Sequence, residues 1–156
     1  MVKLVLSLIF LLSIIQNSQA YDYFTNCTNS PTYTKNSTYQ TNLNTLLTNL
    51  ISKSSLNGFY NISLGQKPNQ IYGSYLCRRD MNSQGCSQCV YQAHNMILQQ
   101  CPSQIWAIIW FDDCMLRFSN VSFFNQLDLA PSTVAYNPQN MTIDESRALI
   151  KALNKT

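Results

Sequence analysis

The stretch from Cys77 to Ser119 decides the fold of this 156-residue chain. It opens with CRRDMNSQGCSQCV at residues 77–90 and closes with PSQIWAIIWFDDCMLRFS at residues 102–119. Five of the six cysteines lie in it, spaced C-x8-C-x2-C-x11-C-x12-C, and Cys27 supplies the sixth. Whether these cysteines pair depends first on whether the chain enters an oxidising compartment.

Residues 1–20 are typical of a secretory signal peptide. Lys3 gives a short positive region, residues 4–15 form an apolar run broken by two serines, and Ser18-Gln19-Ala20 has the small-x-small pattern of a cleavage site. We predict cleavage after Ala20, because the apolar run is too short to serve comfortably as a membrane anchor. The chain is therefore expected to be secreted, without stable membrane insertion after cleavage.

The composition of the remaining chain limits the kinds of partner that it is expected to bind. Removing residues 1–20 leaves enough sequence for one domain with a core. The loss of Lys3 lowers the formal net charge from +3 to +2. A nearly neutral chain argues against a protein that binds nucleic acid by electrostatic attraction.

The chain is rich in Asn-x-Ser/Thr acceptors without proline at x, each a candidate N-glycosylation site in a secreted protein. The stronger candidates are Asn36, Asn61, Asn120 and Asn140. Asn26 is weaker because Cys27 lies inside its acceptor triplet, and Asn154 is weaker because the chain ends two residues later.

Two helices are expected from apolar residues that recur with a period of 3.6. The first spans Thr38–Ser52, and its apolar face consists of Leu43, Leu46, Leu47, Leu50 and Ile51. The second spans Ser83–Gln100, and its apolar face consists of Cys86, Cys89, Val90, Ala93, Ile97 and Cys101. Disulfides as well as packing should hold this second helix against a sheet.

Four strands are expected. Residues 59–64 alternate, and residues 71–77 form a second strand that pairs with them as a hairpin across a turn that contains Pro68. Residues 105–111 are continuously apolar, which is typical of a strand inside a sheet, and residues 115–120 alternate again.

The ends of the chain differ from this middle part. Residues 21–37 are expected to be an extended arm that the Cys27 disulfide ties down. Residues 126–156 are expected to be a linker or tail, or the start of a second domain. Ile143, Leu149, Ile150 and Leu153 suggest a short amphipathic helix there.

The six cysteines allow more than one chemistry. Three disulfides are the simplest outcome in a small secreted chain, and spacing alone leaves their connectivity open. Cys86-x2-Cys89 has zinc-ligand spacing, but no second such pair exists in the sequence. A thioredoxin-like role for the same pair lacks the βαβ context. We therefore favour disulfides over a metal site or a redox site.

The motifs together resemble a known family. The C-x8-C-x2-C run preceded by IYGSYL, and CMLRFSN followed by FF, are similar to the ginkbilobin-homologous domain, also called the salt-stress-response/antifungal domain. This plant module occurs in cysteine-rich repeat secretory proteins and in the ectodomains of cysteine-rich receptor-like kinases. The resemblance covers about residues 21–125, and it implies an apoplastic location.

The resemblance implies an α+β fold, with two helices on an antiparallel sheet of about five strands. It also implies three disulfides, Cys27–Cys101, Cys77–Cys86 and Cys89–Cys114.

Residues that could support catalysis are few. His94 is the only histidine and has no partner nearby in the sequence. Asp112 and Asp113 are adjacent, so on a strand their side chains would point to opposite faces and not converge on one bond. With every cysteine paired, no thiol would remain as a nucleophile. We expect neither an enzyme nor a cofactor or metal.

The remaining candidates concern binding. Aromatic residues concentrate in the strands and could stack on sugars, although most should belong to the core; they are Tyr72, Tyr75, Trp106, Trp110 and Phe111. A mannose-binding, antifungal member of the family uses an Asn, an Arg and a Glu. The matching positions here are Thr28, Ile108 and Ser119, so the resemblance transfers the fold without that site.

Two functional hypotheses follow. The first is a non-catalytic extracellular module, associated with stress or defence, that binds a protein or glycan. It includes the alternative that the chain is part of a two-domain secretory protein or of a receptor-kinase ectodomain. The second is a mannose-binding antifungal lectin.

Overall fold

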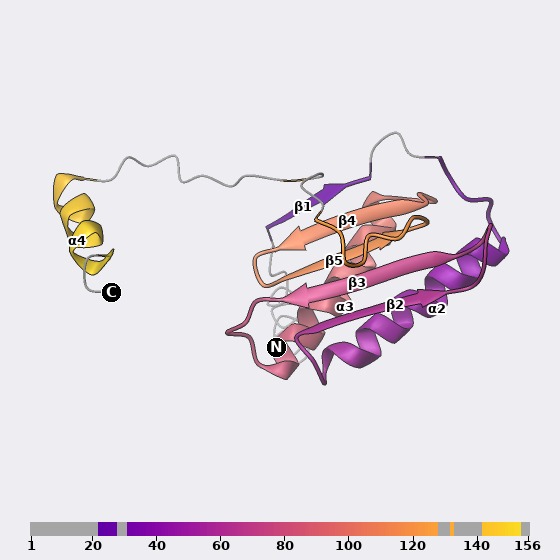
Figure 1. Ribbon diagram of the computed structural model, residues 1–156, viewed down its shortest axis with the longest axis horizontal. Helices are drawn as coiled ribbons and strands as arrows, with labels where there is room; N and C mark the ends of the chain where they lie inside the picture. The colour runs from indigo at the N-terminus through magenta and orange to yellow at the C-terminus, as the bar shows by residue number, and fades with distance from the viewer. Residues whose placement is uncertain (1–21, 28–30, 128–131, 133–141, 154–156) are drawn as a thin grey trace, which may run out of the picture.

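A five-stranded sheet with helices on one side is the main feature of the computed structural model, which describes residues 22–27, 31–127, 132 and 142–153 (Figure 1). The elements in chain order are β1 (Tyr23–Asn26), α2 (Thr38–Ser54), β2 (Phe59–Leu64), β3 (Ile71–Cys77), α3 (Ser83–Gln100), β4 (Trp106–Phe111), β5 (Cys114–Ser119) and α4 (Ile143–Leu153). The expected signal peptide lies outside the described residues.

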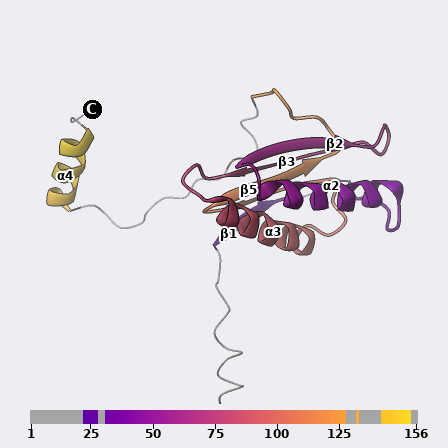
Figure 2. The same ribbon diagram turned by 90° about the horizontal axis from the view of Figure 1, so that it is seen from below.

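The sheet is antiparallel throughout, with strand order β1-β4-β5-β3-β2. Helices α2 and α3 both pack on the same face of the sheet, as Figure 2 shows from below. The expected α+β class, the five strands and the three disulfides are confirmed. We call the face opposite these two helices the open face.

Helix α2 follows the predicted apolar period and is two residues longer than expected. Leu43, Leu46, Leu47 and Leu50 are fully buried. The helix begins after Ser37, whose hydroxyl accepts a hydrogen bond from the backbone N–H of Gln40, an N-cap that satisfies one of the free amides of the first turn. Ser54 ends the helix fully buried, and its hydroxyl donates to the Ile51 carbonyl.

Helix α3 has the bounds that the sequence predicts. Asn82 caps it by accepting a hydrogen bond from the Gly85 amide at 2.7 Å. Its buried face meets the inward residues of the sheet, including Tyr75, Ile109, Leu116 and Phe118. Gly73 lies under α2 at a point where a β-carbon would collide with the Leu46 side chain, so glycine lets the helix approach the strand.

Strand β1 is the element that the sequence analysis missed. Residues 23–26 lie in the expected extended arm and pair with β4, so that Phe24 faces Trp110 and Asn26 faces Ile108. Four residues are too few to show an alternating pattern, and the pairing partner lies more than eighty residues away in sequence. With β1 in place, β4 is an interior strand, as its continuously apolar sequence indicates.

Three disulfides link helix α3 to the sheet, and they are the pairs that the family resemblance implies. The Cα atoms lie 5.9 Å apart in Cys27–Cys101, 5.6 Å in Cys77–Cys86 and 6.1 Å in Cys89–Cys114. Every cysteine is bonded, so no thiolate is left to bind zinc or to exchange disulfides.

Helix α4 forms where the tail sequence suggests an amphipathic helix. Thr142 and Glu145 cap it reciprocally: the Thr142 amide donates to the Glu145 carboxylate at 2.8 Å, and the Glu145 amide donates to the Thr142 hydroxyl. These hydrogen bonds from Thr142 lower the pKa of Glu145. Ile143 and Ile150 are exposed, at 71% and 58%.

Candidate functional site

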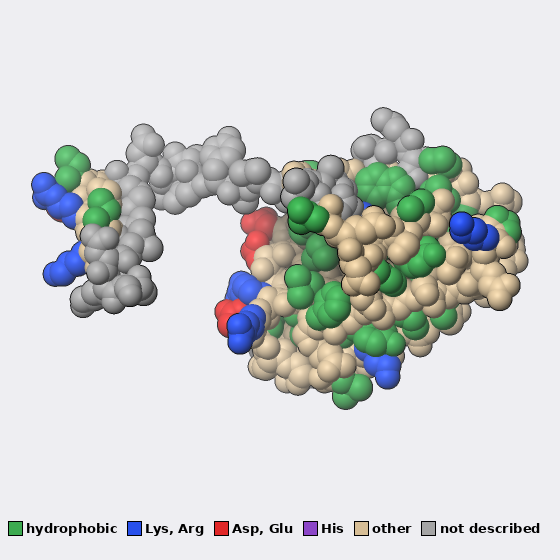
Figure 3. All heavy atoms as spheres, in the orientation of Figure 1, with side chains coloured by type: hydrophobic (Ala, Val, Ile, Leu, Met, Phe, Trp, Pro, Cys, Tyr) green, Lys and Arg blue, Asp and Glu red, His purple; other side chains and the backbone are tan. Residues whose placement is uncertain are grey.

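One row of apolar side chains crosses the whole open face. Strand register aligns one residue from each strand, in the order Phe24, Trp110, Met115, Leu76 and Phe59. We call these five residues the apolar row. Phe24, Leu76 and Phe59 are 46%, 49% and 53% exposed, while Trp110 and Met115 are half-buried. In Figure 3 hydrophobic side chains gather on this face of the sheet.

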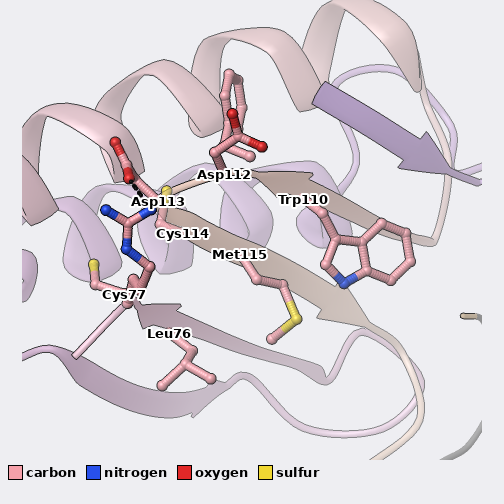
Figure 4. Close-up of a pocket in the computed structure, with 9 residues that line it drawn as sticks. Leu76, Cys77, Trp110, Asp112, Asp113, Cys114 and Met115 are labelled. Carbon is pink, nitrogen blue, oxygen red and sulfur yellow. Dashed lines mark ion pairs between the residues drawn. The ribbon is translucent and has the colours of Figure 1, made fainter. Parts of the chain in front are cut away.

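The middle of the apolar row borders a shallow hollow of about 190 Å³. Leu76, Met115 and Trp110 project to the same side of the sheet there (Figure 4). The rings of Phe24 and Trp110 lie 5.6 Å apart, a distance at which aromatic pairs stabilise one another. The hollow is thus an apolar surface with aromatic side chains on one flank.

Charged residues border one end of this hollow. The Arg78 guanidinium lies 2.6 Å from the Asp80 carboxylate and 3.0 Å from that of Asp113. The hydrogen bond from Arg78 lowers the pKa of Asp80. The same hydrogen bond, together with the negative charges of Asp80 and Asp113, raises the pKa of Arg78. These exposed charges form a polar rim beside the apolar row. Because they are exposed, they contribute little to the stability of the fold.

The two adjacent aspartates do not form a catalytic pair. Both lie in the turn between β4 and β5, and their carboxylates point in different directions (Figure 4). Asp113 pairs with Arg78, whereas Asp112 is exposed. The two aspartates belong to a turn beside Cys114, and their carboxylates do not face a common position where a bond could be cleaved.

The other end of the open face is covered by the segment that follows β5. Phe124 meets Tyr72 edge to face at 5.6 Å, and the Arg117 guanidinium lies over the Phe123 ring at 4.2 Å. The Val121 amide donates to the Ser119 hydroxyl. Residues 121–124 therefore fold back over this end and leave the apolar row uncovered at the opposite end.

The covered end contains the positions that match the family's mannose contacts. Ile108 is 3% exposed and Ser119 is 9% exposed, and both face the open side of the sheet. Thr28 lies outside the described residues. The two described positions are thus buried as well as chemically different from the mannose-binding residues.

The aromatic residues that the sequence groups together are divided between the two faces. Tyr75 and Phe111 pack with the core beneath the helices. Tyr72, Trp106 and Trp110 lie on the open face, as their register partners require. Sequence reasoning missed Phe24, Phe59, Leu76 and Met115 as members of one row, because only the register between distant strands aligns them.

His94 is half-buried on α3, with its Nδ1 3.0 Å from the side-chain oxygen of Asn95. Within the described ranges, no cluster of three His, Cys, Asp or Glu residues could hold a metal ion. The same part of the chain has no helix long and apolar enough to cross a membrane.

The candidate glycosylation sites differ in accessibility. Asn36, Asn61 and Asn120 are exposed, whereas Asn26 is half-buried. Asn140 and Asn154 lie outside the described residues. Glycosylation at these positions stays a prediction.

Comparison with known families shows which family the chain belongs to. The family model described as salt stress response/antifungal matches residues 26–121. The chain belongs to the salt stress response/antifungal family. Its match includes all six cysteines and the five strands apart from the first residues of β1.

Relatives of this salt stress response/antifungal chain are secretory proteins and receptor-like kinases. Cysteine-rich repeat secretory protein 1 of Arabidopsis thaliana is 42% identical over 130 residues, which are 83% of this chain and 38% of that protein. Cysteine-rich receptor-like protein kinase 25 of the same plant is 38% identical over 139 residues, which are 86% of this chain and 20% of the kinase. The chain thus spans well under half the length of these relatives.

A solved structure shows the same fold. The crystal structure of the tandem DUF26 ectodomain from the Arabidopsis thaliana cysteine-rich receptor-like protein PDLP5 matches with a TM-score of 0.73 and 25% identity. The match covers 86% of this chain and 65% of that one. The chain is an extracellular module of this family, since its relatives are secretory proteins or receptor ectodomains. The signal peptide stays a prediction.

Proposed function

We propose that the chain is a non-catalytic extracellular binding module, associated with stress or defence, that docks a protein partner on its apolar row. The observation that supports this most is the exposure of Phe24, Leu76 and Phe59 in one line across the sheet. Contiguous exposed apolar side chains are uncommon on monomers and are typical of interaction surfaces. The ion pair of Arg78 beside them supplies the polar rim that such surfaces have.

A second domain of the same family is the partner that we favour. The PDLP5 relative is described as a tandem ectodomain, and this chain covers 65% of it. Helix α4 follows the domain, and its Ile143 and Ile150 are exposed. Exposed apolar side chains on a helix are typical of an element that packs against a further domain. The association with stress or defence rests on the family description alone.

The mannose-lectin hypothesis has less support. The residues at the matching positions, Ile108 and Ser119, are buried and offer neither a guanidinium nor a carboxylate. A catalytic role has no arrangement in its favour, because the described acidic residues and His94 do not converge.

A second copy of the chain can test the docking surface, since it presents the same apolar row. Mature protein, residues 21–156, is produced with its disulfides formed and its glycans trimmed to single sugars, and its mass is followed by sedimentation as concentration rises. We expect concentration-dependent association that Leu76→Glu abolishes, because the substitution places a charge in the contact. Thermal unfolding of the variant checks that the fold is retained.

Tyr91→Glu is the matched control, because Tyr91 is 54% exposed on helix α3, on the side of the sheet away from the apolar row. This variant should associate like the wild type. A wild-type protein that stays monomeric, or a Leu76→Glu variant that associates equally well, would contradict docking through the apolar row.

A further inference from the structure

Asn61 occupies a position from which a glycan would reach the apolar row. It lies in the middle of β2, an edge strand of the sheet, and its register partner is Ser74. Side chains alternate between faces along a strand, so Phe59, Asn61 and Ser63 all project to the open face. All three are exposed, whereas Tyr60, Ile62 and Leu64 pack toward the core.

The chemistry of glycosylation is available at this position. Asn61-Ile62-Ser63 is an acceptor triplet, and the Asn61 side chain is exposed. Transfer from a lipid-linked oligosaccharide would join the Asn61 amide nitrogen to the anomeric carbon of the first sugar. The amide would lose one proton, and the lipid diphosphate would leave.

The distance to the apolar row is short. Asn61 and Phe59 are two residues apart on one face of β2, which corresponds to about 7 Å along the strand. Leu76 is the register partner of Phe59, so it lies in the same corner of the sheet. A bulky, hydrated glycan at Asn61 would therefore stand beside the two apolar side chains of strands β2 and β3.

The other acceptor sites are placed differently. Asn120 follows the far end of β5, five residues from Met115, which corresponds to about 17 Å along an extended strand. Asn36 precedes helix α2, on the element that packs against the opposite face. Asn26 is on the open face, but it is half-buried beside the Cys27–Cys101 disulfide.

We propose that an N-glycan on Asn61 shields the β2–β3 half of the apolar row and so directs partners to the half formed by Phe24, Trp110 and Met115. This inference rests on the proposed docking function. The same glycan would also guard the outer edge of β2, since strand edges left unpaired invite further strand pairing. The hollow beside Trp110 and Met115 would remain accessible.

The test compares two variants that each remove one acceptor triplet and keep its asparagine. Ser63→Ala removes the triplet of Asn61, and Thr38→Ala removes that of Asn36 as the matched control. Both proteins and the wild type are secreted from a eukaryotic host with glycans intact. Peptide mass spectrometry measures occupancy, and sedimentation measures self-association.

We expect Asn61 to be occupied and Ser63→Ala to strengthen self-association about tenfold or more, with Thr38→Ala matching the wild type. An unoccupied Asn61 would overturn the inference. An occupied Asn61 whose removal leaves association unchanged, although trimming of all glycans strengthens it, would overturn the shielding and leave the proposed docking intact. If even fully trimmed protein fails to associate, the proposed function fails, and the inference fails with it.

Discussion

Tyr39 takes part in a pair of hydrogen bonds that joins three elements at one carbonyl. Its side chain is 5% exposed, and its hydroxyl donates to the carbonyl of Ile105 at 2.7 Å. The same carbonyl accepts from the Asn120 amide at 3.1 Å, so helix α2 is tied to the start of β4 and the end of β5. Burial, with a smaller effect from the nearby Tyr33, raises the pKa of Tyr39.

Tyr39→Phe should lower the free energy of unfolding at neutral pH by about 0.5–1.5 kcal/mol, because one hydrogen bond is lost while Asn120 still satisfies the Ile105 carbonyl. The raised pKa adds a pH dependence. Stability from the protonated phenol is fully present below the unfolded pKa of 10.0 and is lost as pH rises above it. Wild-type protein should therefore lose more stability than the variant between about pH 9 and about pH 11.

Urea unfolding at both pH values measures this difference. Tyr91→Phe serves as the control, because Tyr91 is 54% exposed and should change stability little. A Tyr39→Phe variant with wild-type stability at both pH values would show that the hydrogen bond contributes nothing measurable.

At the scale of elements, strand β1 depends on a disulfide as well as on the sheet. It pairs with β4 over four residues and ends next to Cys27, which is bonded to Cys101 at the end of helix α3. Phe24 and Tyr23 add ring contacts with Trp110 and Phe111. A strand this short at a sheet edge has few hydrogen bonds, so the disulfide should determine whether it stays in place.

Replacement of both cysteines, Cys27→Ser with Cys101→Ser, should lower the melting temperature by more than about 10 °C. The Cys27–Cys101 loop has a sequence separation of 74, and for such a loop chain entropy predicts that the disulfide stabilises the fold by up to about 4.5 kcal/mol. Amide exchange at Tyr23–Asn26 should rise as β1 detaches. Thermal unfolding and hydrogen-exchange mass spectrometry give the two readouts.

The matched control is Cys77→Ser with Cys86→Ser, which opens a loop with a sequence separation of 9. Loss of this disulfide should lower the free energy of unfolding by about 3 kcal/mol. It should leave the exchange at β1 unchanged. An equal or larger loss of stability in the control would show that loop length does not govern these disulfides.

For the whole molecule, the two faces of the sheet have different roles. One face builds the core with helices α2 and α3, and its residues Ile109, Leu116 and Phe118 are buried. The open face is divided: residues 121–124 cover the end near Tyr72, and the apolar row is left exposed at the other end. The apolar row is therefore the largest exposed apolar feature of the open face among the described residues.

This arrangement predicts that the chain does not bind mannose at the family's positions, because Ile108 and Ser119 lie at the covered end. Mature protein with trimmed glycans should show no saturable binding to mannan that free mannose competes. Trimming is needed because the chain's own mannose-rich glycans could bind the reagents. Competed, saturable binding that survives Trp110→Ala would place a sugar site outside the apolar row and count against this division of the open face.

Sequence alone determined most of the elements. The apolar period of Leu43, Leu46, Leu47 and Leu50 defined α2, and the cysteines and Ile97 defined α3, since a helix that packs on a sheet must bury one stripe of side chains. Alternation or continuous apolar sequence located four of the five strands. These signals are local, and a sequence displays them whatever its neighbours in space.

Tertiary structure decided the features that depend on pairing between distant strands, which local sequence patterns do not record. Strand β1 exists because residues 23–26 find β4, and the apolar row exists because register brings Phe59, Leu76, Met115, Trp110 and Phe24 into one line. Each of these side chains is unremarkable within its own strand. Pairing between strands far apart in sequence is set by the packing of the whole domain, and that packing turns five separate residues into a surface.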